Sequence, residues 1–228
     1  MEKERCICSV LSLRKGESAK EMATILAKLL WERERQKVLF VPAGIQFERT
    51  GTVSLTELYF FHRKEQSLSQ HLVGKGPIFV NSFHCFLESA EITDMQYKAF
   101  FEKLAEEVSC MVVSLDGVSS AQLFWFLEQS DVVAVLTECN KGIPSAEFSG
   151  FLYNLRLLWG EELGEQLKRF LFLLPGGGQS DKTGIQKRIR EEGIFLEKEE
   201  EEMVFVTEEE LAKQKLLFRR KAKGRDVL

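Results

Sequence analysis

Short apolar runs and longer amphipathic segments alternate along most of the chain. Runs typical of buried parallel strands are residues 6–13, 38–41, 76–81, 110–115, 132–136 and 170–174. Segments with apolar residues at helical spacing are residues 18–30, 55–61, 95–108, 121–128, 148–159 and 161–167. Strands that alternate with helices predict an α/β fold, a doubly wound and mostly parallel sheet with helices on both faces.

Two of the predicted helices carry a defined apolar face. The first is predicted to turn one stripe toward the sheet: Met22, Ile25, Leu26, Leu29 and Leu30. The segment 95–108 follows Thr93 and Asp94, which make a good helix N-cap. Its predicted core face consists of Tyr97, Phe100, Phe101 and Leu104.

The composition is that of an ordinary globular protein. The 228 residues are 44% hydrophobic and 29% charged, which predicts one large α/β domain, and the net charge of −4 argues against a nucleic-acid partner. The five cysteines are scattered, mostly in apolar runs, and predict small buried side chains in a reducing compartment. Because no run of about 18 apolar residues occurs, we expect a cytoplasmic protein.

The first strand runs through a short basic turn directly into the first helix. Such a unit binds phosphate because backbone N–H groups of the turn and of the first helical turn point at one spot, where the helix dipole also favours negative charge. A working phosphate-binding loop reads G-x-x-x-x-G-K-[ST], with a lysine on the phosphates and a hydroxyl on magnesium. Residues 14–21 read RKGESAKE, which predicts the fold of such a loop with a degraded site.

The loop resembles that of the MinD/ParA-type ATPases, which reads K-G-G-x-G-K-[ST]-[ST]. In one register Lys15 stands for the first lysine, and Gly16 and Lys20 match the family pattern. In the other, Arg14 takes that place, Gly16 still falls on a glycine, and Ala19 replaces the phosphate lysine. The second register aligns the downstream helix with the corresponding helix of the family. The sequence alone does not decide between the two registers.

Both registers lose the magnesium hydroxyl and bring a carboxylate into the loop. Glu17 is expected near the phosphates, and Ser18 and Glu21 complete the candidate site. Like charge in a poorly screened site costs on the order of kcal/mol. We therefore expect ATP or ADP to bind weakly and magnesium to contribute little.

Further resemblances follow downstream. Asp116 takes the place of the switch aspartate at the carboxyl end of a strand and joins the candidate site, whereas Asp131 opens a segment that resembles the family's aspartate and apolar strand. Pro42 stands near the place of an aspartate that the family uses in catalysis. The stretch from Phe47 through residues 55–61 resembles the TadZ/CpaE branch, which implies a role in Flp-type pilus assembly.

The C-terminal part has opposed charge blocks. Residues 191–210 hold ten glutamates and one lysine, and residues 211–228 hold four lysines and three arginines against one aspartate. We predict a MinD/ParA-like domain over residues 1–178 and a charged segment over 179–228 that packs on it or extends from it. The basic, partly apolar tail resembles the membrane-binding terminal helix of MinD-like proteins; a solvated helix docked on the domain is the alternative.

These features predict a localisation or scaffold factor that hydrolyses no nucleotide or binds it weakly. Its expected partners are proteins of a membrane-associated assembly, a second copy of the chain as in the resembled family, and the inner face of the cell membrane. The alternative is an active ATP-dependent switch with an unusual loop. Magnesium-dependent ATP turnover separates the two.

Overall fold

The computed structural model describes residues 5–14, 19–34, 36–44, 51, 53–83, 92–174, 177, 179–191 and 205–207. The chain divides into two compact units. The first comprises Met1–Leu11 and Ser18–Val132, and the second comprises Ser12–Glu17 and Val133–Leu228. The predicted boundary at residue 178 stays a prediction.

Parallel strands form the centre of the first unit. They are β1 (Cys6–Ser12), β2 (Val38–Pro42), β3 (Val53–Ser54), β4 (Ile78–Asn81) and β5 (Cys110–Ser114), in the order β1-β5-β2-β4-β3. Each neighbouring pair is parallel. Cys6 pairs with Cys110, and Pro42 pairs with Ser114, so the carboxyl ends of β2 and β5 meet at one edge.

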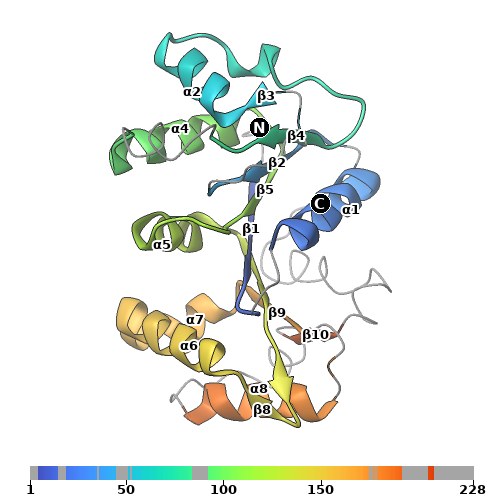
Figure 1. Ribbon diagram of the computed structural model, residues 1–228, viewed down its shortest axis with the longest axis vertical. Helices are drawn as coiled ribbons and strands as arrows, with labels where there is room; N and C mark the ends of the chain where they lie inside the picture. Colours follow the sequence, from blue (N-terminus) through green and yellow to red (C-terminus); the bar gives the residue numbers. More distant parts are fainter. Residues whose placement is uncertain are drawn as a thin grey trace. The chain divides into compact units, whose positions relative to one another are not determined.

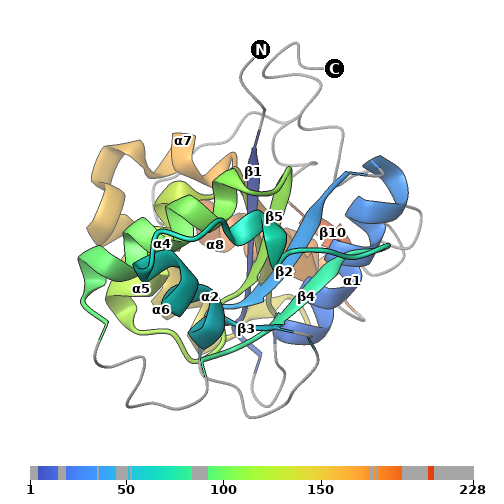
Figure 2. The same ribbon diagram turned by 90° about the horizontal axis from the view of Figure 1, so that it is seen from above.

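Helices cover both faces of these strands. Figures 1 and 2 show α1 (Ala19–Glu34) on one side, with α2 (Leu55–Arg63), α4 (Asp94–Glu106) and α5 (Ser120–Gln129) on the other. A short 3₁₀ turn, Leu68–Gln70, follows α2. The predicted α/β fold with a mostly parallel sheet is confirmed.

The second unit repeats the same local arrangement. Its strands β6 (Val132–Leu136), β9 (Phe170–Leu174) and β10 (Phe205–Thr207) are parallel in the order β10-β9-β6. Its helices are α6 (Ala146–Trp159), α7 (Leu163–Leu167), which follows a 3₁₀ turn at Gly160–Glu162, and α8 (Gln179–Glu191). The short strands β7 (Cys139–Asn140) and β8 (Ile143–Pro144) form an antiparallel hairpin.

The hairpin turn rests against α8. Lys141 and Gly142 both have positive φ, 52° and 79°, as a two-residue hairpin turn requires. The Gly142 N–H donates to Asp181 Oδ1 at 2.9 Å, and a Cβ at Gly184 would overlap with the carbonyl of Gly142. Gly184 therefore permits the backbone of α8 to touch the turn.

The predicted core face of α4 is confirmed. Thr93 caps the helix with its side chain, and Tyr97, Phe100, Phe101 and Leu104 are buried. The aromatic rings of α4 and α5 meet edge to face, with Phe101 and Phe126 centroids 5.1 Å apart.

The predicted stripe of α1 is wrong in part. Ile25 is 47% exposed, and the buried positions are Ala19, Ala23, Leu26 and Ala27. These residues repeat at helical spacing, and the three alanines let the helix backbone lie close to the strands. The prediction assigned core positions to large side chains, and of the five residues it named only Leu26 is buried.

Burial accounts for the described cysteines. Cys6, Cys8 and Cys110 are buried and Cys139 is half-buried. Burial raises the pKa of the Cys8 thiol, and burial with the negative charges of Asp181 and Glu138 raises the pKa of Cys139 to about 11. The thiols of Cys8 and Cys139 therefore stay protonated at neutral pH. Cys85 lies outside the described residues.

Asp131 precedes β6 and binds the start of β1. Its Oδ2 accepts the Ile7 N–H at 2.9 Å, and its own N–H donates to the Ile7 carbonyl. Replacing Asp131 by alanine should lower the free energy of unfolding by about 1–2 kcal/mol, since a hydrogen bond to a charged group is lost. Urea unfolding measures this, and Asp131→Asn should lie between the two. A variant as stable as wild type would show that the contact contributes nothing.

Candidate functional site

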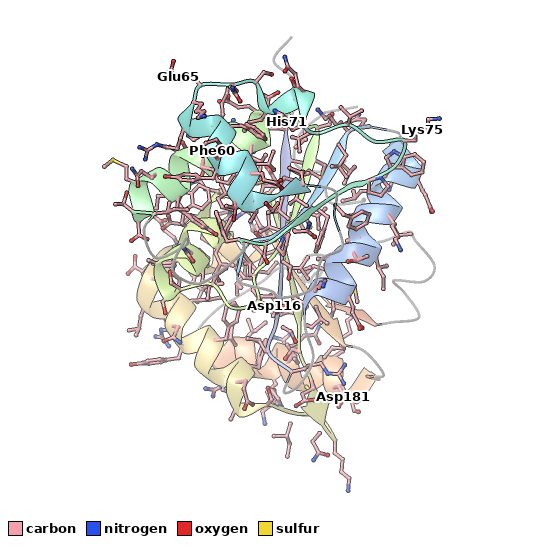
Figure 3. The ribbon with its side chains drawn as sticks, turned by 45° about the horizontal axis from the view of Figure 1, so that its top comes forward. Phe60, Glu65, His71, Lys75, Asp116 and Asp181 are labelled. Atoms are coloured by element: carbon pink, nitrogen blue, oxygen red, sulfur yellow. The ribbon has the colours of Figure 1, made fainter. Side chains whose placement is uncertain are left out.

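The candidate site lies where α1 begins and β5 ends. The Asp116 carboxylate accepts two backbone N–H groups of the first turn of α1, that of Ala19 at 3.0 Å and that of Lys20 at 3.1 Å. The Ser114 hydroxyl donates to the same carboxylate at 3.1 Å. Figure 3 shows Asp116 beside the N-terminal end of α1. A negative charge from β5 thus lies at the positive end of the helix dipole.

Close backbone packing fixes Asp116. Gly117 turns the chain with a φ of 73°, and a Cβ at Gly44 would overlap with the Asp116 carbonyl. Ala43 makes two hydrogen bonds. Its N–H donates to the carbonyl of Ser114 in β5 at 3.0 Å, and its carbonyl accepts the buried hydroxyl of Tyr97 in α4 at 3.1 Å. The carboxyl ends of β2 and β5 therefore hold the aspartate against α1 together.

The structure brings together part of the predicted site. Ala19, Lys20 and Asp116 are in contact, as just described, and Glu21 lies exposed in the first turn of α1. Four further predicted residues lie outside the described part of the chain: Lys15, Gly16, Glu17 and Ser18. Pro42 is the last residue of β2, at the edge that carries Asp116.

Two residues of this site were missed from the sequence. Ser114 looks like one more buried strand residue, and only its place two residues before Asp116 could have suggested that it binds the carboxylate. Gly44 follows the strand end at Pro42, which signals a turn, but its contact with Asp116 joins residues 72 positions apart. Local patterns do not contain such a contact.

A second polar cluster lies in the second unit, at the carboxyl end of β6. Arg14 Nε is 3.6 Å from Glu138 Oε2, and the Leu13 N–H donates to the Leu136 carbonyl at 2.8 Å. Arg14 replaces the first lysine in one of the two loop registers, so this ion pair engages the side chain that would act there. Neighbouring Thr137 is buried, and its hydroxyl has no hydrogen-bond partner among the described residues.

Other candidate chemistry is sparse in the described part of the chain. No three His, Cys, Asp or Glu side chains gather there in a way that could hold a metal ion. His71 stacks on Phe61, with centroids 3.8 Å apart, and burial lowers the pKa of His62, with Lys103 and Arg63 adding to the effect. No described helix is both long and apolar enough to cross a membrane.

Solved structures share this fold over nearly the whole chain. A ParA-family ATPase from Chlorobium tepidum TLS superposes with a TM-score of 0.65 at 16% identity, covering 97% of this chain and 91% of its own. The chain has the ParA-type fold. A plasmid partition protein from Borrelia burgdorferi B31 bound to AMPPNP has a TM-score of 0.51 at 16% identity, over 90% of this chain and 86% of its own.

A Cyanothece McdA variant in complex with ATP also shares the ParA-type fold, with a TM-score of 0.50 at 15% identity, covering 82% of this chain and 79% of its own. No protein-family model matches the sequence, and no curated protein is significantly similar to it. The likeness therefore extends to the fold and not to the sequence, and the activity must be argued from the chain's own residues.

The contact between Gly44 and Asp116 predicts a strict requirement for glycine. Gly44→Ala should destabilise the protein by about 3 kcal/mol, because the new Cβ would enter the backbone of Asp116 and force β2 and β5 apart. Gly76→Ala is the matched control, since a Cβ there meets nothing within 4 Å. Thermal or urea unfolding compares them, and equal stability of the two variants would contradict the close approach.

Proposed function

We propose that this chain is a ParA-like localisation or scaffold factor that binds nucleotide weakly and does not hydrolyse it. One observation carries the proposal: the Asp116 carboxylate accepts the backbone N–H groups of Ala19 and Lys20 at the start of α1. In a phosphate-binding loop the N–H groups of this region bind the anionic ligand. Here a side chain of the protein itself binds them.

A phosphate group at this helix end would have to compete with the carboxylate. Two like charges about 4 Å apart repel by about 4 kcal/mol at an effective dielectric constant of about 20. Moving Asp116 away would break the hydrogen bonds that it accepts from Ala19, Lys20 and Ser114. Both costs lower the affinity for ATP or ADP.

The sequence of the loop supports the same conclusion. The proposed weak site consists of Lys15, Gly16, Glu17, Ser18, Ala19, Lys20, Glu21 and Asp116. Glu21 and Met22, or Lys20 and Glu21, stand where the resembled family has its two hydroxyl residues, so magnesium has no hydroxyl ligand in either register. Pro42 offers no carboxylate at the end of β2.

An active ATP-dependent switch is the second candidate. Lys20 and Asp116, two residue types that phosphoryl transfer uses, lie at the same helix end, and this arrangement favours it. In that case Asp116 would leave α1 when nucleotide arrives and would hold magnesium through water. The two candidates thus assign opposite roles to one side chain.

Replacing Asp116 separates the candidates. If the carboxylate blocks the site, Asp116→Ala should raise ATP affinity about tenfold or more without magnesium, because a competing negative charge is gone. If it serves a switch, the same variant should abolish magnesium-dependent turnover. Calorimetry and a phosphate-release assay, each with and without a chelator, measure both.

Asp131→Asn is the matched control for charge removal, because Asp131 binds the start of β1. It should leave ATP binding as in wild type. A wild-type protein that binds ATP with micromolar affinity, and loses that affinity on removal of magnesium, would contradict the degraded site.

The cellular role belongs to the same proposal. A non-hydrolysing ParA-like protein would act by binding proteins of a membrane-associated assembly at the cytoplasmic face of the cell membrane, and the TadZ/CpaE resemblance suggests Flp-type pilus assembly. The tail over residues 211–228, which lies outside the described residues, would supply the membrane contact. Each basic residue near an anionic surface contributes about 1 kcal/mol.

The membrane contact predicts a lipid-dependent difference between two proteins. Full-length protein should sediment with vesicles that contain anionic lipid, and a version that ends at Glu210 should not, because it lacks the seven basic residues of the tail. Neutral vesicles and high salt should release the full-length protein, since screening shortens the range of the attraction. Equal sedimentation of both versions would exclude a membrane role for the tail.

A further inference from the structure

Helix α6 has two apolar sides, and the fold uses one of them. Its buried residues, Phe148, Phe151, Leu152 and Leu155, recur at helical spacing. Their aromatic members pack on β9, with centroid distances of 5.3 Å for Phe148 and Phe172 and 6.3 Å for Phe151 and Phe170. Figure 1 shows α6 lying along one side of β9.

The other side of α6 is apolar and exposed. Ala146 and Gly150 are exposed, Tyr153 is 55% exposed and Leu157 is 68% exposed. Their spacing of four, three and four residues places them in one row, which we call the outer stripe of α6. Two of the eight large exposed apolar residues in the described part of the chain, Tyr153 and Leu157, lie on this stripe.

The outer stripe is complementary to itself. When two copies of a helix pack antiparallel about a twofold axis, positions equally far from the axis face each other. We place the twofold axis at the level of α6 midway between positions 151 and 152, on the exposed side of the helix. Ala146 then lies opposite Leu157 of the second copy, and Gly150 lies opposite its Tyr153. Each small residue then faces a large one, and nothing lies within 4 Å of a Cβ at Gly150 to obstruct the incoming ring.

The charges at the two ends of α6 fit the same pairing. Lys141 is exposed in the hairpin turn that leads into the helix, and Glu161 and Glu162 are exposed just after its last turn. Within α6 itself, Glu147 lies in the first turn and Arg156 in the last. An antiparallel arrangement brings Lys141 and the positive end of each helix dipole toward Glu162 of the other copy.

We propose that α6 is a self-association surface through which two copies of this chain pair antiparallel about that axis. The outer stripe belongs to the second unit, and the pairing needs no nucleotide. One helix face covers less than the roughly 800 Å² per partner of a stable complex, so the dimer should be weak, with a dissociation constant on the order of 100 µM.

Sedimentation equilibrium of the full-length protein without nucleotide tests the pairing. Between about 10 µM and about 1 mM the average mass should rise from that of the 26.2 kDa monomer toward that of a dimer. Leu157→Lys should weaken association at least tenfold. Val73→Lys, which changes a residue that is 76% exposed in the first unit, is the matched control and should associate as wild type does.

Gly150→Leu distinguishes a specific interface from nonspecific hydrophobic association. It adds apolar surface and suits a helix better than glycine, so the monomer should stay folded, which circular dichroism checks. It also fills the space meant for Tyr153 of the second copy. We expect at least tenfold weaker association, whereas association as strong as wild type would overturn the proposed register.

A charge exchange tests the direction of the helices. Lys141→Glu should weaken association, and adding Glu162→Lys to it should restore the wild-type level, because the opposite charges face each other again. A wild-type mass that stays at the monomer value over the whole range would overturn the proposal, as would a charge exchange without effect.

Discussion

The start of α1 is the constraint on which the first unit depends. A helix leaves its first N–H groups without partners inside the helix, and its dipole makes that end positive. The chain meets both needs with Asp116, whose carboxylate binds Ala19 and Lys20. Asp116 follows β5, its side chain binds the start of α1, and its backbone carbonyl lies against Gly44 after β2, so one residue connects a helix to two strand ends.

The same solution has a cost for ligand chemistry. A helix N-terminus is an anion site as long as its N–H groups face a ligand, and a carboxylate that binds them competes with any phosphate. The chain has the ParA-type fold, and in it the carboxylate of Asp116 lies at the start of α1. A fold can keep its packing while its site changes, since strands and helices pack through apolar faces that the loops do not supply.

Periodicity predicted most of the fold, because long strands and amphipathic helices repeat their burial at fixed spacing. The core face of α4 follows from such spacing alone. Periodicity predicted the wrong residues where packing depends on backbone proximity. Ile25 was predicted to be buried, yet it is exposed and the alanines of α1 are buried. Periodicity also missed α8, in which Ile185 and Ile189 are the buried apolar residues of an otherwise polar helix.

The candidate site was predicted less completely than the fold. Asp116 was identified by its place at the end of a strand, but the groups it binds come from residues about 97 positions away. Gly44 has no side chain from which a contact could be predicted. It permits two backbone segments to approach closely, and this is visible only in the folded chain. Contacts of this kind are properties of the folded chain and leave little trace in local sequence.

The glycine contact between α8 and the β7–β8 hairpin has a mechanical consequence. Gly184 and Gly142 touch through their backbones, and Asp181 binds the turn as well, so the hairpin is held directly against α8. The hairpin leads directly into Ser145, whose hydroxyl caps α6. A displacement of α8 would therefore be transmitted through the hairpin to the first turn of α6.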